Sequence, residues 1–338
     1  KRNSLSCSFF VNKITVNQFW YKMSNLQVKG LQGISIDFAI KFAICHDEFY
    51  LFSDNDNNIY SIDSNYLSIN KLAPPDKKIT GKITAIDFSP SRKYVAAGYS
   101  DGSIQLFDID TNKASRILSK PNNSSVLSII FYSDTYLFAS FSNKTFIRYK
   151  IGFTISNKIL ESSFSNILGL YRPIVYCFVG GAQKSSKVVL PSFLNTIFIS
   201  TESNFYVYLL DKDLNLSKQV LKLDSGHITP CFKIDSQNVL MGLTYPDKIE
   251  IYSLKVDNDL KIEKKSTVAT QFPITFLSFL SSMILFGHDQ ECEHFSMISL
   301  DNGQSNPIET TISQLLSKGL FIQGSSNNGP IFFKDQKV

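Results

Sequence analysis

The chain has 338 residues, 43% of them hydrophobic, which is enough to bury a large core. Its 34 Lys and Arg and 29 Asp and Glu residues give a net charge of +5, spread along the chain in short pairs, so we expect no nucleic-acid binding. The five Cys residues include no C-x-x-C pair and indicate reduced thiols in a cytosolic protein.

The first apolar segment, residues 8–23, supports two interpretations. Val16, Phe19, Trp20 and Met23 have the spacing of one helix face. The sequence FFVNKITV at residues 9–16 instead has the pattern of an extended strand. The choice between them depends on the fold of the residues that follow.

From residue 33 onward, a unit of short apolar strands separated by polar turns recurs. The clearest copy is ITAIDFSPSRKYVAAGYSDGSIQLFDID at residues 83–110, in which Ser-Asp-Gly makes the turn before the last strand. Seven copies fit, starting near residues 33, 82, 125, 187, 227, 273 and 311. Most of the intervals between equivalent positions are 40–49 residues, which is about the length of four short antiparallel strands. We attribute the one longer interval to an insert at about residues 152–186, an extra hairpin or a long loop.

These repeats predict an all-β fold, a seven-bladed β-propeller with degenerate WD-type repeats over residues 30–338. Two β-sandwiches are the alternative, but their strands do not normally recur in the same order of strands and turns. A propeller avoids an open sheet edge by joining its first and last blades. We therefore expect residues 1–29 to close the ring, with an exposed docking segment as the alternative.

Few of the motif residues of a regular WD repeat occur in this chain. Such repeats carry a Gly-His pair, an Asp in the second turn and a final Trp-Asp, which form hydrogen bonds within the blade. The closest matches are Asp101 with Phe107-Asp108, and Gly226-His227, while Trp20 lies outside every repeat. We therefore expect the blades to be held together mainly by apolar packing of Phe, Ile, Leu and Tyr.

Candidate catalytic and metal-binding residues have structural explanations. His288, Cys292 and His294 fall within seven residues, but no fourth zinc ligand is evident near them. We interpret His227 as a packing residue, and Gly98 and Gly102 as hairpin residues where a positive φ favours Gly. The chain is therefore expected to have no enzymatic activity, no cofactor and no bound metal, and no residue can be assigned to partner binding.

Several segments, in their order along the chain, resemble one family of propellers. They are IYSID at 59–63, KITAIDFSPSRKYVAAGYSDGSIQLFDID at 82–110, SSVLSIIFYSDTYLFASFSNKTFIRYKIG at 124–152, YRPIVYCFVGG at 171–181 and LNTIFISTESNFYVYLLD at 194–211. This series resembles the amino-terminal propeller of the vacuolar protein sorting-associated protein 8 family, subunits of the CORVET endosomal tethering complex. The chain departs from the family pattern at Ser142-Asn143-Lys144, where the family has a more glycine-rich turn.

The resemblance implies a non-catalytic protein-interaction head of an endosomal vesicle-tethering subunit. By this resemblance, the head recognises a GTP-bound early-endosomal Rab GTPase, belongs to a hetero-oligomeric complex, and is cytoplasmic and peripheral on endosomal membranes. The nearly apolar run at 274–287 is shorter than the ~20 residues of a spanning helix, so membrane association is expected to be peripheral only. Because the chain begins with Lys1 and stops at Val338, we expect a fragment of a larger protein. The resemblance implies that an α-solenoid ending in a RING-type zinc domain would follow.

Two other classes of function remain open at this point. One is a scaffold propeller of another coat, ciliary-transport or nuclear-pore complex. The other is a propeller that binds peptides at its axial opening, or a propeller enzyme. This second class predicts charged side chains from several blades that converge on the central channel.

Overall fold

The fold is known from a computed structural model of the chain. The structure describes residues 49–63, 68–119, 123–151, 164–172, 195–224, 239–256 and 259–270 continuously, and elsewhere between residues 14 and 334 it describes strands only. Every regular element in this described part is a β-strand, and no described helix could span a membrane. The predicted all-β fold is confirmed.

Six four-stranded antiparallel sheets form the main blades within the described residues. Blade 1 contains β5 (Ile40–His46), β6 (Phe49–Asp54), β7 (Ile59–Asp63) and β8 (Ser68–Lys71). Blade 2 contains β9 (Ile83–Phe88), β10 (Tyr94–Tyr99), β11 (Ile104–Asp108) and β12 (Lys113–Ser119). Blade 3 contains β13 (Val126–Phe131), β14 (Tyr136–Phe141), β15 (Phe146–Lys150) and β16 (Ser156–Leu160).

The second half of the chain repeats this arrangement. Blade 4 contains β17 (Ile167–Tyr171), β20 (Thr196–Thr201), β21 (Phe205–Leu210) and β22 (Leu216–Leu223). Blade 5 contains β23 (Pro230–Ile234), β24 (Val239–Thr244), β25 (Lys248–Val256) and β26 (Leu260–Ala269). Blade 6 contains β27 (Ile274–Leu280), β28 (Met283–His288), β29 (His294–Ser299) and β30 (Ser305–Pro307).

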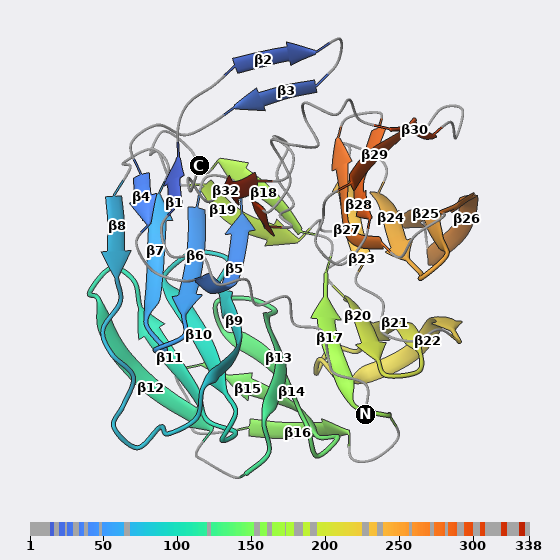
Figure 1. Cartoon of the computed structure of the whole chain (residues 1–338). Coiled ribbons are helices and arrows are strands. Elements are labelled where there is room, and N and C mark those ends of the chain that lie inside the picture. Colours follow the sequence, from blue (N-terminus) through green and yellow to red (C-terminus); the bar gives the residue numbers. More distant parts are fainter. Residues whose placement is uncertain are drawn as a thin grey trace.

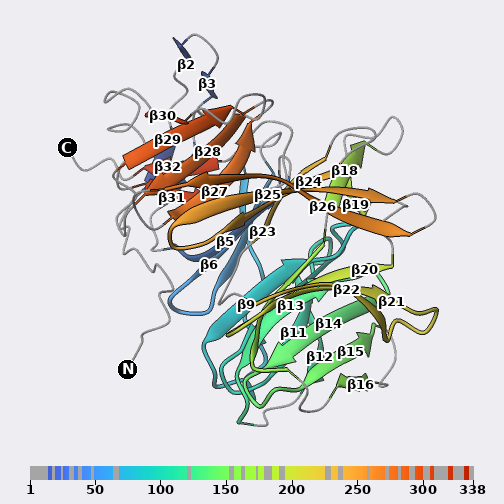
Figure 2. The same ribbon diagram turned by 90° about the vertical axis from the view of Figure 1, so that its right-hand side faces the viewer.

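The first strands of the blades follow one another round the middle of the molecule. In Figure 1, β5, β9, β13, β17, β23 and β27 surround a common centre, and neighbouring members of this series contact one another from β5 to β17. Figure 2 shows blades 2, 3 and 4 side by side in one part of the molecule, with blades 5 and 6 in the other. This radial arrangement is that of a propeller.

Described strands from the first and last parts of the chain contact one another and blade 1. β31 (Gly319–Ile322) and β32 (Ile331–Lys334) form a hairpin, and β1 (Ile14–Val16) pairs with β4 (Ile34–Ile36). β1 contacts β32, and β31 contacts β5 of blade 1. A seventh blade built from both ends is consistent with these contacts, and ring closure by residues 1–29 stays a prediction. Within residues 1–29 the structure also describes the hairpin of β2 (Trp20–Met23) and β3 (Leu26–Lys29), so the helical interpretation of Trp20 and Met23 is wrong.

The insert is shorter than expected and lies inside a blade. The hairpin of β18 (Ile174–Phe178) and β19 (Ser185–Val189) joins β17 to β20, the first and second strands of blade 4. Blade 4 therefore begins at Ile167 and not near residue 187, and residues 156–160 form the outer strand of blade 3. Val188 was mistaken for the start of a blade because a short apolar run fits a hairpin equally well; it pairs with Val175.

Burial of a strand follows its position within the blade. β10 and β20, the second strands of their blades, are buried along almost their whole length. The outer strand β26 is mostly exposed, and the outer strand β12 has no buried residue. A second strand is covered by neighbouring blades on both faces, so its sequence is apolar without alternation.

The core lies between the blades and not within a single sheet. One cluster joins Ala96 and Leu106 of blade 2 to Ile129 and Phe131 of blade 3. Equivalent clusters join blades 1 and 2, 3 and 4, 4 and 5, and 5 and 6. The predicted apolar packing of the blades is confirmed by these clusters.

Two glycines interpreted as hairpin residues have different roles. Gly102 has a φ of 86°, as the predicted tight turn requires. Gly98 lies inside β10, where a Cβ atom would come within 2.5 Å of Cγ1 of Val126 in blade 3. The hairpin explanation of Gly98 is therefore wrong, because its function is to let the next blade approach. Gly242 of β24 has the same role, since a Cβ there would lie 2.8 Å from Cδ2 of Leu277 in blade 6.

Candidate interaction surface

The turns of the blades emerge on two opposite sides of the ring. Turns that join first to second strands, or third to fourth strands, lie on one side because successive strands are antiparallel. We call this side of blades 2–4 the hollowed face; it is built from residues 89–93, 109–112, 132–135 and 211–215. The β18–β19 hairpin leaves blade 4 on the same side.

On the opposite side, Asp101 organises the entry to blade 2. Its Oδ2 accepts hydrogen bonds from the N–H groups of Thr80 and Gly81, both at 3.0 Å, and its Oδ1 accepts one from Ser103 at 2.9 Å. Burial favours the neutral carboxyl group, but these hydrogen bonds outweigh it, so the pKa of Asp101 lies below its ordinary value. Asp101 therefore stabilises turns, as the Asp of a WD repeat does.

The other sequence candidates do not form a chemical site. Phe107 is 1% exposed in the core between blades 1 and 2, and Asp108 accepts two hydrogen bonds from Thr111 at 2.8 Å within its own turn. His288 and His294 are partners in the β28–β29 register. Cys292, Gly226 and His227 lie outside the described residues. The described residues contain no group of three or more potential metal ligands, and the absence of metal from the protein stays a prediction.

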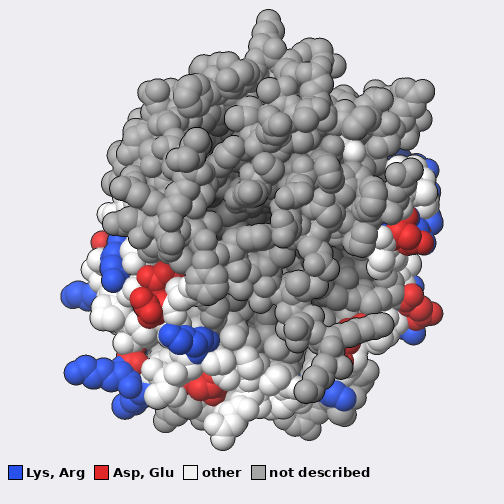
Figure 3. Space-filling model, viewed as in Figure 1, with Lys and Arg blue, Asp and Glu red and all other residues white. Residues whose placement is uncertain are grey.

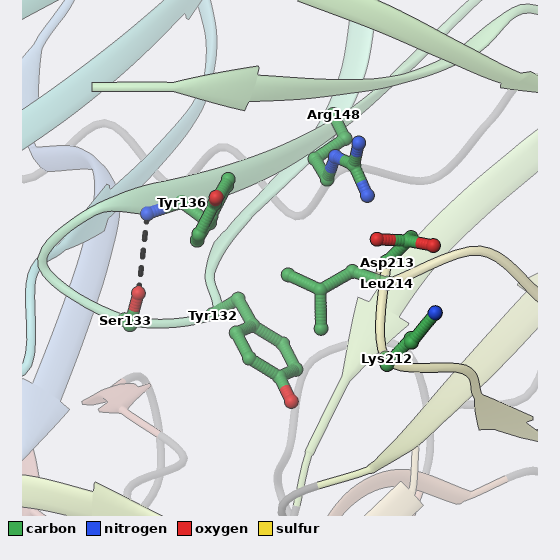
Figure 4. A pocket seen from close by; sticks show the side chains of 7 residues that line it. All are labelled: Tyr132, Ser133, Tyr136, Arg148, Lys212, Asp213 and Leu214. Carbon is green, nitrogen blue, oxygen red and sulfur yellow. Dashed lines mark hydrogen bonds between the residues drawn. The ribbon is translucent and has the colours of Figure 1, made fainter. Parts of the chain in front are cut away.

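The first hollow of the hollowed face lies between blades 3 and 4 and has a volume of about 310 Å³. Figure 4 shows the side chains that surround it. They are Tyr132, Ser133, Tyr136, Arg148, Lys212, Asp213 and Leu214, contributed by the β13–β14 loop, by β14, by β15 and by the β21–β22 turn. The hollow therefore combines two aromatic rings and a leucine with three charged groups.

The second hollow lies between blades 2 and 3 and also has a volume of about 310 Å³. Its lining residues are Tyr94, Leu106, Ser115, Arg116, Asp134, Thr135 and Ile151. The two hollows lie on either side of the β13–β14 loop, which contributes Tyr132 and Ser133 to the first and Asp134 and Thr135 to the second.

The loop between the hollows is held by hydrogen bonds at both ends. Ser133 Oγ accepts from the N–H groups of Thr135 at 3.1 Å and Tyr136 at 3.2 Å, the second of which is drawn in Figure 4. Asp134 Oδ1 accepts from the N–H of Ser91 in blade 2 at 2.9 Å. The loop is therefore tied to its own blade and to the preceding one.

The opposite wall of the first hollow is a tight turn with a left-handed leucine. Asp211 Oδ1 accepts from the N–H groups of Asp213 and Asn215, both at 2.8 Å, and Leu214 has a φ of 59°. The hydrogen bond from Asn215 is the main cause that keeps the pKa of Asp211 below its ordinary value. Leucine rarely adopts a positive φ, so the carboxylate network overcomes the local preference and places Leu214 in the wall of the hollow.

Behind the first hollow, Arg172 joins blades 3 and 4. Its side chain is 3% exposed, its Nε donates to the carbonyl oxygen of Thr196 at 3.2 Å, and its Nη1 donates to that of Tyr132 at 2.8 Å. The guanidinium also lies 4.0 Å from the centre of the Tyr132 ring. Burial lowers the pKa of Arg172 to about 10, so the group stays charged at neutral pH.

Side-chain hydrogen bonds also join blades 1 and 2 and blades 2 and 3, and the apolar repeats did not predict them. Asp87 Oδ2 of blade 2 accepts from the N–H of Phe131 in blade 3 at 2.8 Å. Asn57 of blade 1 donates to the carbonyl of Gly81 and accepts from the N–H of Ile83, both at 2.9 Å. The blades are therefore joined by side-chain hydrogen bonds in addition to apolar packing.

Charge does not gather on the central channel in the described first strands of blades 2–4. Their one charged side chain, Asp87, is 6% exposed and binds the next blade. On the face in Figure 3, the described acidic and basic side chains are interspersed and form no large patch of a single sign. These features give no support to a channel site for charged peptides.

Solved structures of similar shape are propellers. The β-propeller domain of Cps50 (Swd1) from Myceliophteria thermophila has a TM-score of 0.54 and 11% identity, and the match covers 80% of this chain and 89% of that domain. The computationally designed Ika8 protein has a TM-score of 0.53 and 14% identity over 89% of this chain and 88% of its own. The protein is therefore a β-propeller.

The particular family follows from the sequence of the blades. The model of the Vps8 β-propeller family matches residues 60–329, which is most of the chain. The chain belongs to this family, and the resemblance inferred from the order of its blades is confirmed.

Curated relatives match over shorter segments. UvrABC system protein C of Ureaplasma parvum is 27% identical over an alignment of 213 residues, and the match covers 56% of this chain and 36% of that protein. The human protein Atg16l2 is 31% identical over 98 residues, 28% of this chain and 16% of that protein. The chain thus spans little more than a third of the length of the first of these relatives and less of the second.

Proposed function

We propose that this propeller is the non-catalytic protein-interaction head of an endosomal vesicle-tethering subunit, and that it recognises a GTP-bound early-endosomal Rab GTPase. The observation that carries the proposal is membership of the Vps8 β-propeller family over residues 60–329. The protein would act as one subunit of the hetero-oligomeric CORVET complex, in the cytoplasm and peripherally on endosomal membranes.

The physical character of the ring suits recognition and not chemistry. Hydrogen bonds such as those of Asp134 and Asp211 fix the loops of the hollowed face before a partner arrives. Loops held by a rigid scaffold lose little conformational entropy on binding, so they favour association with a preformed surface. A GTP-bound Rab offers such a surface, because the γ-phosphate orders its switch regions.

The test is calorimetric titration of the chain with an early-endosomal Rab from its own organism, loaded with GTP or with GDP. We expect the GTP form to bind at least about tenfold more tightly, a difference of about 1.4 kcal/mol, because the switch regions are ordered only in that form. A Rab of another compartment in its GTP form serves as the control. Equal affinity for both nucleotide states, or no binding at several hundred micromolar protein, would contradict Rab recognition.

A further inference from the structure

One exposed threonine of blade 5 lies in a strand with an open edge. Thr267 belongs to β26, the last strand in the sheet order of this blade, and Figure 1 shows this strand at the outer rim. Leu260 and Ile262, near the start of β26, belong to the core cluster shared with blade 4. No described strand pairs with the other edge of β26, so the part around Thr267 is an extended segment that another protein can read.

Two lysines precede Thr267 at the spacing that one class of protein kinase selects. Lys264 and Lys265 stand three and two residues before it, and their side chains are 46% and 49% exposed. Kinases that select basic substrates hold the substrate extended and place acidic groups against cations at these two positions before the acceptor hydroxyl. The same lysines stand two and one residues before Ser266, so the spacing fits Thr267 and not its neighbour.

One of these lysines also belongs to a buried ionic network on the same face. Glu250 of β25 is 4% exposed and is the direct cross-strand partner of Thr267. Its Oε1 accepts hydrogen bonds from Lys248 Nζ at 2.9 Å and Lys264 Nζ at 2.6 Å, and its Oε2 accepts one from the Tyr252 hydroxyl at 2.7 Å. Burial raises the pKa of Glu250, but these hydrogen bonds outweigh it and lower the pKa to about 2, so the group is charged at neutral pH.

A phosphate on Thr267 changes the balance of this network. Directly paired residues of an antiparallel sheet share a face, with Cβ atoms about 4.5–5.5 Å apart. A phosphate carries a charge of about −1.5 to −2, so at this position it repels Glu250 and attracts Lys248 and Lys264. A buried carboxylate that loses its cations destabilises a protein strongly. Its remaining partner, Tyr252, belongs to the core cluster between blades 4 and 5, so the effect reaches this seam.

We propose that Thr267 is a phosphorylation site for a kinase that selects basic residues, and that its phosphate draws the two lysines away from Glu250 and loosens the seam between blades 4 and 5. The kinase transfers the γ-phosphoryl group of ATP. The bond from the γ-phosphorus to the β–γ bridging oxygen breaks, a bond from phosphorus to Oγ1 of Thr267 forms, and the hydroxyl proton passes to the catalytic aspartate of the kinase. This inference does not depend on Rab binding.

The first experiment incubates the whole chain with ATP and the catalytic subunit of cAMP-dependent protein kinase, and locates the phosphate by mass spectrometry. We expect phosphate on Thr267, and a kcat/KM at least about tenfold lower for Lys265→Gln, which removes one of the two selected charges. The matched control is Lys261→Gln, which removes the same charge from an exposed position of the same strand and should stay within about twofold. Phosphate on Ser266 alone, no phosphate on Thr267, or equal effects of the two Lys variants would overturn the proposal.

The second experiment compares thermal melts of the chain before and after phosphorylation. The midpoint should fall by at least about 3 °C in the unaltered chain. In Glu250→Gln the phosphate opposes no buried charge, so it should not lower the midpoint of that variant. Thr267→Glu, compared with the neutral Thr267→Gln, places a carboxylate opposite Glu250 and should lower the midpoint without any kinase. An unchanged midpoint after phosphorylation, or an equal fall in Glu250→Gln, contradicts the proposed effect on the seam.

Discussion

Replacing Arg172 by Met is expected to lower the free energy of unfolding by about 3 kcal/mol. The substitution removes two charge-assisted hydrogen bonds across the seam between blades 3 and 4, together with the contact on the Tyr132 ring. Each such bond contributes ~1.5–3 kcal/mol to stability. Removing the buried charge also removes its desolvation cost, which offsets part of this loss. In a thermal melt of a chain of this length, the midpoint should fall by about 4 °C.

Two further variants make this test specific to the geometry of the guanidinium. Arg172→Lys keeps the charge but loses the planar fork, so its midpoint should lie between those of the unaltered chain and Arg172→Met. Lys93→Met also replaces a cation above a tyrosine ring, but Lys93 is exposed, and its loss should change stability by less than about 1 kcal/mol. A midpoint unchanged by Arg172→Met would mean that this residue does not join the blades.

Replacing Gly98 by Ala is expected to destabilise the ring by about 2 kcal/mol, although alanine is ordinarily harmless in a strand. The new Cβ atom would lie 2.5 Å from Cγ1 of Val126 and 2.8 Å from Cδ1 of Ile129, so blades 2 and 3 would have to separate. Val126 is fully buried and β-branched, and it has little freedom to move away.

A double-mutant cycle measures whether this close approach is the cause. Val126→Ala alone should also destabilise the chain, by about 2 kcal/mol, because it leaves a cavity. In the combined variant the closest atom, Cγ1 of Val126 at 2.5 Å, is gone, although its Cβ stays at 2.8 Å, so the total loss should be ~1 kcal/mol smaller than the sum. If the losses of stability in the two single variants simply add in the combined variant, residues 98 and 126 do not clash at the contact between blades 2 and 3.

The fold could be predicted because its signal is local and repeated. Each copy of the unit carries strand patterns and turn residues within about 30 positions, as at residues 83–110, and several copies support one another. The position of the insert was not predictable in the same way. Val188 lies in an apolar run that suits a blade strand and a hairpin strand equally, and only the pairing with Val175 distinguishes them.

The residues that join the blades were missed because their partners are distant in the sequence. Arg172 binds the carbonyl oxygens of Tyr132 and Thr196, 40 and 24 positions away, and no motif surrounds it. Gly98 resembled a turn residue because it precedes the Ser-Asp-Gly turn, yet the reason for it is Val126 of the next blade. The two hollows were missed for the same reason, because neighbouring blades contribute their opposite walls. Contacts of this kind depend on how repeats stack, which a single unit does not encode.

The most direct test of the proposed role is purification of the full-length protein from its source, followed by mass spectrometry of the proteins that accompany it. We expect the class C sorting subunits of the endosomal tethering complex in stoichiometric amounts, because the chain belongs to the Vps8 β-propeller family. Recovery of ciliary-transport or nuclear-pore components in their place would contradict the account and assign this propeller to a different scaffold.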